Sequence, residues 1–190
     1  MSRRLIKAGH EVHGYRNNYK KAEEQFEKGY ISGCTTSLEN LVQVVHQGNA
    51  IYGEKSGETV YTPGVFMMVV PAETVEDTLN ELLQFCNEGD IVIDHGNSNF
   101  KDSRRRAERL AKLGIAYIDC GTSGGVYGLE RGFCLMVGGG KSAVDVCRPL
   151  FDALAPGISA APRTNDSDNF TWYPEEFGWM HCGDPGAGHF

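Results

Sequence analysis

The stretch "DIVIDHGNSNFKDSRRRAERLAKLGIAYIDCGTSGG", residues 90–125, contains two short apolar runs separated by an amphipathic one. Residues 90–94 and 115–119 are apolar on both faces, which is typical of strands in a parallel sheet that helices cover on both sides. Residues 101–114 have the hydrophobic spacing of a helix and end at a glycine. A strand, a helix and a second strand in this order predict a βαβ unit.

The rest of the chain repeats this alternation. Further strands are predicted at 11–15, 63–71 and 131–139, and further helices at 18–29, 36–48, 73–89 and 142–155, the last interrupted at Pro149. The sequence therefore predicts an α/β fold with a doubly wound, mostly parallel sheet. Residues 46–64 are expected to be a polar insertion, and residues 156–179 a loop or flexible link.

The composition excludes several classes of protein. A chain of 190 residues with 41% hydrophobic and 23% charged residues is typical of one globular domain with a real core. The net charge of −7 argues against nucleic-acid binding, and the basic run at 104–106 is expected to be a solvated helix face. No apolar run is long enough to predict a membrane span. The six cysteines form no CxxC pair, so free thiols in the cytoplasm are expected, with neither disulfides nor a metal site.

Polar or glycine-rich residues follow four of the predicted strands. They are "RNN" at 16–18, "PAE" at 71–73, "HGNSN" at 95–99 and "GTSGG" at 121–125. Ligands of open α/β sheets bind beyond the carboxyl ends of the strands, so these segments predict a ligand site. A plain tight turn is the alternative for the glycines, because glycine permits both a turn and a close approach to a ligand.

Residues 121–125 also match the Gly-x-Ser-x-Gly pattern that presents a hydrolase nucleophile, here Ser123. Such a serine needs a positioned base and an acid. The sequence suggests no such pair, so a hydrolase is not favoured.

The motifs at 89–139, from "GDIVIDHGNSNF" to "GTSGGVYGLERGFCLMVGG", closely resemble the decarboxylating 6-phosphogluconate dehydrogenase family. The short bacterial-style branch of that family carries "IDGGNS", "GTSGG.WGLERG" and, later, "HCGP.GAGHF". The likeness runs from Met1 to Phe190 apart from the two insertions. Related β-hydroxyacid dehydrogenases usually carry "D-x-S-T" where this chain has "HGNS".

The resemblance implies an oxidoreductase of the pentose phosphate pathway and gluconate utilization. Such an enzyme oxidises the C3 hydroxyl of 6-phosphogluconate with NADP, or alternatively NAD, and releases CO2 to give ribulose 5-phosphate. It implies a Rossmann-like, incomplete dinucleotide-binding domain at 1–155, and a loop and the start of a link to a helical substrate domain at 156–190. It also implies a homodimer or homotetramer for the complete enzyme.

Site residues are carried over by position. The substrate-binding residues would be Asn97, Ser123, Gly124 and Gly125. The cofactor-binding residues would be Arg16, Asn17, Asn18, Val70, Pro71, Ala72 and Asn97. Arg16 favours NADP, because no acid is present in the segment that meets the ribose. The alternatives are a turn role for Asn97, a helix cap at Ser123 and a plain surface position for Arg16.

The chain also departs from the family pattern. His95 replaces a glycine and would crowd the nicotinamide. The resemblance places the first strand and its glycine loop before Met1, and the general base and acid beyond Phe190, so the catalytic residues are unknown and the chain alone is expected to be inactive. Without that central strand, the strands at 11–15 and 90–94 are expected to lose a neighbour, leaving the chain insoluble or molten. A dehydrogenase for a small 3-hydroxy acid and a non-catalytic cofactor-binding module remain alternatives.

Overall fold

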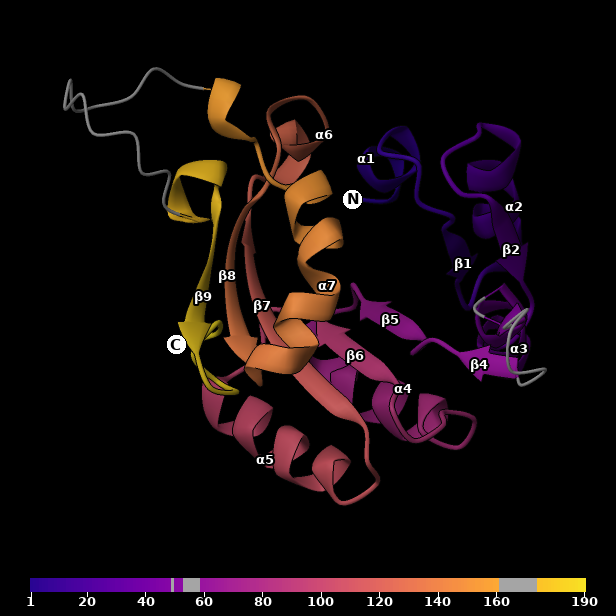
Figure 1. The fold of residues 1–190 in the computed structure, drawn as a ribbon. Coiled ribbons are helices and arrows are strands. Elements are labelled where there is room, and N and C mark those ends of the chain that lie inside the picture. Colours follow the sequence, from indigo (N-terminus) through magenta and orange to yellow (C-terminus); the bar gives the residue numbers. More distant parts are fainter. Residues whose placement is uncertain (49, 53–58, 161–173) are drawn as a thin grey trace, which may run out of the picture.

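The computed structural model describes residues 1–48, 50–52, 59–160 and 174–190, arranged as strands flanked by helices (Figure 1). The helices are α1 (Ser2–Lys7), α2 (Tyr19–Glu27), α3 (Leu38–Gly48), α4 (Val75–Leu82), α5 (Phe100–Ala111), α6 (Gly128–Arg131) and α7 (Lys141–Leu154). The strands are β1 (His13–Tyr15), β2 (Gly33–Thr35), β3 (Ala50–Tyr52), β4 (Thr59–Tyr61), β5 (Val65–Met68), β6 (Ile91–Asp94), β7 (Ala116–Ser123), β8 (Cys134–Gly139) and β9 (Trp179–Gly183). None of the helices in these ranges is long and apolar enough to cross a membrane.

The larger sheet has the strand order β5-β6-β7-β8-β9. Strands β5, β6 and β7 run parallel, β8 is antiparallel to β7, and β9 is parallel to β8. One face packs against α7 through a cluster that includes Ile93, Ile118 and Phe151. The other face packs against α3, α4 and α5 through a cluster that includes Val92 and Leu110. Helices therefore cover both faces, which confirms the predicted α/β class.

A second, two-stranded sheet pairs β1 with β2 in parallel, and α2 and α3 pack against it. Within the described ranges, β1 and β5 do not pair with each other, and no other strand pairs with both of them. Both strands line a cavity of about 760 Å³. In Figure 1, β1 and β2 lie to one side of the larger sheet, beyond β5. The predicted single sheet is thus divided between β1 and β5 into a smaller sheet, β1-β2, and a larger one, β5-β6-β7-β8-β9.

Polar contacts fasten this smaller part to the larger one on both sides. On one side, the Arg4 guanidinium donates hydrogen bonds to the carbonyl oxygens of Leu129, Ala153 and Ala155, at 3.3, 3.1 and 2.6 Å. On the other side, His46 Nε2 lies 3.0 Å from both oxygens of the buried Asp90 carboxylate. Asp90 also accepts from the backbone N–H groups of residues 64 and 87, which fixes the start of β6.

The structure corrects the predicted edges of the sheet. The strand at 90–94, which is β6, is paired on both sides, by β5 and β7. Instead, β5 lacks a paired neighbour on its edge toward β1, because β5 is the outermost strand of the larger sheet on that side. The expectation for 11–15 agrees with the structure, since β1 pairs only with β2 among the described strands.

One further prediction differs from the structure, and the structure describes two other predicted segments in part. Helix α7 continues through Pro149, because its buried face, which includes Cys147, Phe151 and Leu154, packs on the sheet and offsets the lost backbone hydrogen bond. The segment 46–64 contains the end of α3 and the antiparallel β3–β4 hairpin. In the segment 156–179, residues 161–173 lie outside the described ranges, and strand β9 begins at Trp179.

Candidate dinucleotide and substrate site

One buried carboxylate, Asp94, fixes the loop that follows β6. Its Oδ1 accepts the backbone N–H of Gly96 at 2.8 Å, and its Oδ2 accepts the hydroxyls of Ser98 and Tyr117, each at 2.8 Å. Burial, together with the charge of Asp94, holds the pKa of Tyr117 far above its usual range, so the phenol keeps its proton and donates. Asn97 is exposed between these two tethered neighbours, which presents its amide at the end of the strand.

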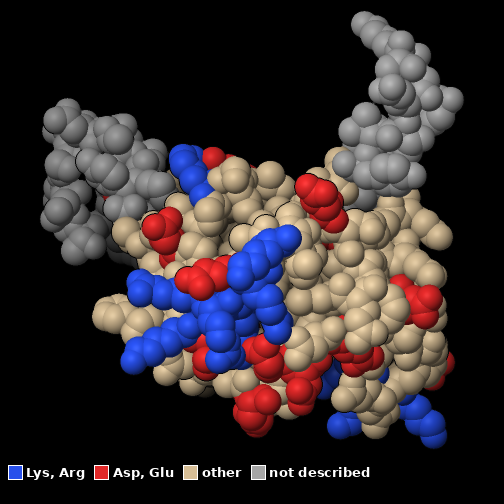
Figure 2. Space-filling model, turned by 90° about the horizontal axis from the view of Figure 1, so that it is seen from below, with Lys and Arg blue, Asp and Glu red and all other residues tan. Residues whose placement is uncertain are grey.

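Arg106 completes this anchor from α5. Its guanidinium is buried and lies 3.4 Å from Asp94 Oδ2 and 2.9 Å from Glu76 Oε2. Partial burial alone would raise the pKa of Glu76, but hydrogen bonding to Arg106 and the nearby arginines lower it. The basic run at 104–106 is therefore only partly the solvated face that the sequence predicts. Arg106 is buried, whereas Arg104 and Arg105 of the same run are exposed. Figure 2, a view of the molecule from below, shows Lys and Arg side chains gathered on this face.

His95 lies against β7 with its ring buried. Its Nδ1 is 3.0 Å from Thr122 Oγ1, and the Thr122 hydroxyl donates to the carbonyl oxygen of Cys120 at 3.1 Å. The hydroxyl proton is thus engaged, which assigns the imidazole proton to Nδ1 and leaves a lone pair on Nε2. That Nε2 has no hydrogen-bond partner among the described residues. Burial lowers the pKa of His95 to about 3, so the ring is neutral.

The end of β7 exposes the predicted substrate residues. The strand extends to Ser123, beyond the predicted end at 119. Gly124 and Gly125 follow with φ angles of 143° and 49°, in the left-handed region that favours glycine, and all three residues are exposed. The residue that precedes the next helical turn is Gly124, so Ser123 is not its cap. A hydroxyl and a strongly turned backbone are therefore open to solvent here.

The loop after β5 approaches the loop after β6. A Cβ atom added at Gly96 would lie 3.1 Å from the carbonyl oxygen of Val70, so a larger residue here would require one of the two loops to shift. Pro71 is exposed and Ala72 is half-buried. Val69, the residue before Val70, exposes 63% of its surface, so an apolar side chain is open to solvent at the strand end. The structure thus brings Val70 beside the segment that carries Asn97.

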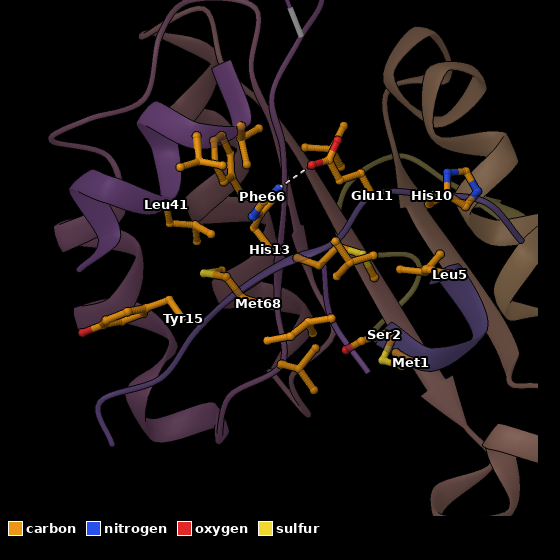
Figure 3. A pocket seen from close by; sticks show the side chains of 18 of the residues that line it. Met1, Ser2, Leu5, His10, Glu11, His13, Tyr15, Leu41, Phe66 and Met68 are labelled. Atoms are coloured by element: carbon orange, nitrogen blue, oxygen red, sulfur yellow. Dashed lines mark hydrogen bonds and ion pairs between the residues drawn. The ribbon is translucent and has the colours of Figure 1, made fainter. Parts of the chain in front are cut away.

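Arg16, Asn17 and Asn18 follow β1 and are exposed. Arg16 lines the cavity of Figure 3, which Val69 and Val70 also line, so the loops after β1 and β5 face one hollow. Among the described residues, no backbone hydrogen bond joins Asn17 or Asn18 to the residues at 95–97 or 123–125. Exposed polar loops and an exposed valine therefore lie along this edge, with the buried His95 Nε2 behind them.

The C-terminal segment is anchored by Asp119, a residue that the sequence reasoning missed. Its buried carboxylate accepts the backbone N–H groups of Gly186 and His189, at 2.6 and 2.8 Å. His189 Nδ1 lies 2.9 Å from Ser103 Oγ, and its Nε2 has no partner within the described ranges. In the sequence, Asp119 and Asp94 each follow a run of apolar residues, and a carboxylate at that position was the signal that could have found Asp119.

Two other chemistries find no support in the described part of the chain. His95 contacts Thr122 and not Ser123, so no described hydrogen bond gives Ser123 a base. No group of three His, Cys, Asp or Glu side chains within these ranges could hold a metal ion. The six cysteines are free thiols, and burial raises the pKa of Cys120 to about 12.

A mostly parallel sheet that helices cover on both faces, with polar loops at the strand ends, has the architecture of a Rossmann-type domain. The family model described as the NAD binding domain of 6-phosphogluconate dehydrogenase matches residues 1–162, and the chain belongs to this family. It is therefore a domain of the NAD(P)-binding type from a family of NAD(P)-dependent oxidoreductases.

Relatives with curated names support this assignment. YqeC of Bacillus subtilis is 30% identical over 190 residues, which cover the whole chain and 52% of that protein. The NAD(+)-dependent, decarboxylating 6-phosphogluconate dehydrogenase of Haloferax volcanii is 41% identical over 126 residues, covering 66% of this chain and 35% of the enzyme. The chain thus spans about half, or less, of the length of these relatives.

Two solved structures show the same fold. 6-Phosphogluconate dehydrogenase of Plasmodium falciparum has a TM-score of 0.71 at 21% identity, over 99% of this chain and 35% of its own. 3-Hydroxyisobutyrate dehydrogenase of Mycobacterium tuberculosis has a TM-score of 0.69 at 20% identity, over 99% of this chain and 51% of its own. At these identities the likeness concerns the fold alone.

Proposed function

We propose that this domain holds the cofactor and one end of the substrate in an enzyme that oxidises and decarboxylates 6-phosphogluconate with NADP. The observation that carries the proposal is the presentation of Asn97, whose neighbours Gly96 and Ser98 are both tethered to Asp94. The sequence "IDHGNS" around it belongs to the motif that resembles this family. The product of the reaction would be ribulose 5-phosphate.

Each predicted residue has a chemical task in this proposal. The bound dinucleotide supplies the hydride acceptor for the C3 carbon. The Asn97 amide can donate and accept at once, so it can orient the nicotinamide and the substrate together. The Ser123 hydroxyl and the N–H groups of Gly124 and Gly125 would hold the carboxylate end of the substrate. Loss of CO2 from the resulting β-keto acid then needs mainly a stabilised enolate.

Arg16 supports NADP as the cofactor in this proposal. A guanidinium pairs well with a phosphate, and residues 15–18 contain no carboxylate to bind a free ribose hydroxyl. The curated relatives include both an NAD(+)-dependent and an NADP(+)-dependent enzyme, so membership of the family leaves the choice to such local residues. Val70, Pro71 and Ala72 would line the cofactor in either case.

A small 3-hydroxy acid is the second candidate substrate. The fold of 3-hydroxyisobutyrate dehydrogenase matches nearly the whole chain, and this substrate class carries no phosphate. The replacement of a family glycine by His95 also favours a changed pocket. A non-catalytic cofactor-binding module is the third candidate.

Ligand-observed NMR tests these candidates on purified chain for which a cooperative thermal transition has first shown a folded state. NADP, NAD, 6-phosphogluconate and 3-hydroxyisobutyrate are titrated singly and in pairs. We expect 6-phosphogluconate to bind best with NADP present, and Asn97→Ala and Ser123→Ala to weaken that binding about 10-fold. Ser142→Ala, an exposed serine on α7, is the matched control. Preferential binding of 3-hydroxyisobutyrate would favour the second candidate, and binding of dinucleotide alone the third.

A further inference from the structure

Side chains that carry sulfur gather on one face of strands β8 and β9. Successive side chains of a strand point to opposite faces of the sheet. Leu135 and Val137 of β8 and Trp179 of β9 are buried in the cluster that packs against α7. The neighbouring side chains point to the opposite face, and three of them carry sulfur: Cys134, Met136 and Met180.

The register of the sheet brings these three side chains together. Met136 and Met180 are direct partners in the parallel β8–β9 pair, and neighbouring strands lie about 4.8 Å apart. Cys134 stands two residues before Met136 on the same face, and its Sγ lies 3.9 Å from Met136 Sδ. A Cβ atom added at Gly121, the partner of Met136 on β7, would lie 3.1 Å from Met136 Cε, so the glycine leaves room for this side chain.

The sulfur atoms are accessible to a small ion. Cys134 is an exposed free thiol, Met180 exposes 48% of its surface, and Met136 is half-buried between them. A second exposed thiol, Cys182, lies within electrostatic reach of Cys134. Burial raises the pKa of Cys182, and the charges of Asp119 and Cys134 raise it further. A cation bound here would relieve this repulsion between neighbouring negative charges.

The distance and the type of these donors both fit a soft metal ion. With metal–sulfur bonds of about 2.3 Å, trigonal coordination places two sulfur atoms about 4 Å apart. Thiolate and thioether sulfurs are soft ligands, which favour Cu(I). Zinc sites use Cys, His, Asp and Glu, and no group of three such side chains lies in the described part of the chain. Methionine is unbranched and flexible, so Met180 can turn its sulfur toward the other two.

We propose that Cys134, Met136 and Met180 form a binding site for one Cu(I) ion, with the Cys134 thiolate as the charged ligand and the two thioethers completing a trigonal set. The Cys134 thiol releases its proton to water when the ion binds, and copper keeps its oxidation state. The spacing of the cysteines predicts no metal site, because two of the three ligands are methionines on different strands. The proposal is independent of the substrate.

Competition for Cu(I) tests this site. The ion is added without oxygen to the reduced chain, against bicinchoninate as the competing ligand. We expect one tightly bound ion per chain, and X-ray absorption that shows three sulfur neighbours at about 2.3 Å. Cys134→Ser, Met136→Leu and Met180→Leu should each weaken binding about 10-fold or more. Leucine keeps the apolar volume of methionine, and Met180 is exposed, so Met180→Leu cannot act through folding alone.

Matched controls remove the same kinds of sulfur elsewhere. Met67→Leu removes a half-buried thioether from β5, and Cys34→Ser removes a half-buried thiol from β2. Neither should change the affinity for Cu(I) by more than about 2-fold, because both lie on other strands. Unchanged affinity in Met180→Leu, copper held in linear geometry by two thiols, or equal weakening by Cys182→Ser and Cys134→Ser would each overturn the proposal.

Discussion

Strand β6 and strand β1 are both short, and both lie beside helices, yet their burial differs. All four residues of β6 are buried, whereas the three residues of β1 are only half-buried. Strand β6 has a hydrogen-bonded neighbour on each edge, and β1 has one neighbour among the described strands. The comparison teaches that burial in this fold depends on paired strands on both edges as much as on helices over both faces.

The largest loss in the free energy of unfolding is expected at Asp94, the buried carboxylate at the end of β6. Asp94→Ala would leave the buried Arg106 guanidinium without a carboxylate at 3.4 Å and remove the acceptor of the Tyr117 hydroxyl. Arg106 keeps Glu76 Oε2 at 2.9 Å, but the buried Ser98 and Tyr117 hydroxyls lose their acceptor. Each unsatisfied buried group costs about 1–3 kcal/mol, so we expect a loss of about 3–5 kcal/mol in all. Urea unfolding, followed by fluorescence, should show this loss in the free energy of unfolding.

The matched control for this prediction is Asp145→Ala. Asp145 pairs with Lys141 and Arg148 on the exposed side of α7, and such solvent-screened surface pairs contribute little to stability. Equal losses for the two aspartates would show that the network around Asp94 does not stabilise the larger sheet.

Acid is expected to weaken the same part of the molecule through His95. The pKa of His95 is about 3 in the folded chain, because of burial, against about 6.5 for a free histidine. The unfolded chain therefore takes up a proton that the folded chain does not, and stability falls as the pH drops from 6.5 toward 3. The loss is about 3 kcal/mol by pH 4.

Urea midpoints measured between pH 7 and pH 4 check this expectation. His95→Gln removes the titrating group but keeps a polar side chain near Thr122, so its stability should depend less on pH. The same steepness in both proteins would mean that the ring accepts a proton without unfolding.

Arg4→Ala tests how the smaller sheet is held. The guanidinium bonds three carbonyl oxygens around the end of α7, and hydrogen bonds from a charged group contribute about 1.5–3 kcal/mol. We expect a loss of ~2 kcal/mol that appears chiefly as faster hydrogen exchange in β1 and β2, with β6 and β7 unchanged. Arg3→Ala, which removes a guanidinium 4.1 Å from the Tyr30 ring centroid, should have a smaller effect. Uniform acceleration in both sheets would show that the two parts unfold as one unit.

Much of the fold could be predicted from the sequence where apolar periodicity was strong. Strands β1, β5, β6, β7 and β8 and helices α2, α3, α4, α5 and α7 all lie within or across their predicted ranges. Strand β2 was missed because "GCT" is too short to show a pattern, and β9 because it follows a segment rich in polar residues. The prediction that the strand at 90–94 loses a neighbour was wrong because strand order depends on contacts between segments far apart in the sequence. Hydrophobic periodicity carries no information about those contacts.

The candidate site was predictable only as a set of exposed loops. The position of Asn97 could be inferred from its motif, but the tethering by Asp94 could not, because two of its partners, Arg106 and Tyr117, lie on α5 and β7. The orientation of His95 depends on Thr122 on the neighbouring strand. Such side-chain pairs are a property of the packed fold. The roles of the residues toward cofactor and substrate remain predictions.

The smallest effect is expected at the end of β1, where the Arg16 side chain is exposed. Arg16→Asp should shift the ratio of the Kd values for NADP and NAD about 10-fold toward NAD, or ~1.4 kcal/mol. A carboxylate repels the 2′-phosphate and accepts the ribose hydroxyls of NAD. Lys20→Asp, on the nearby exposed surface of α2, makes the same change in charge and should shift the ratio far less. Because Arg16 is exposed, neither substitution should alter the free energy of unfolding by more than about 0.5 kcal/mol. An equal shift for both variants would assign the preference to net charge, and no shift for Arg16→Asp would place the discriminating residue elsewhere.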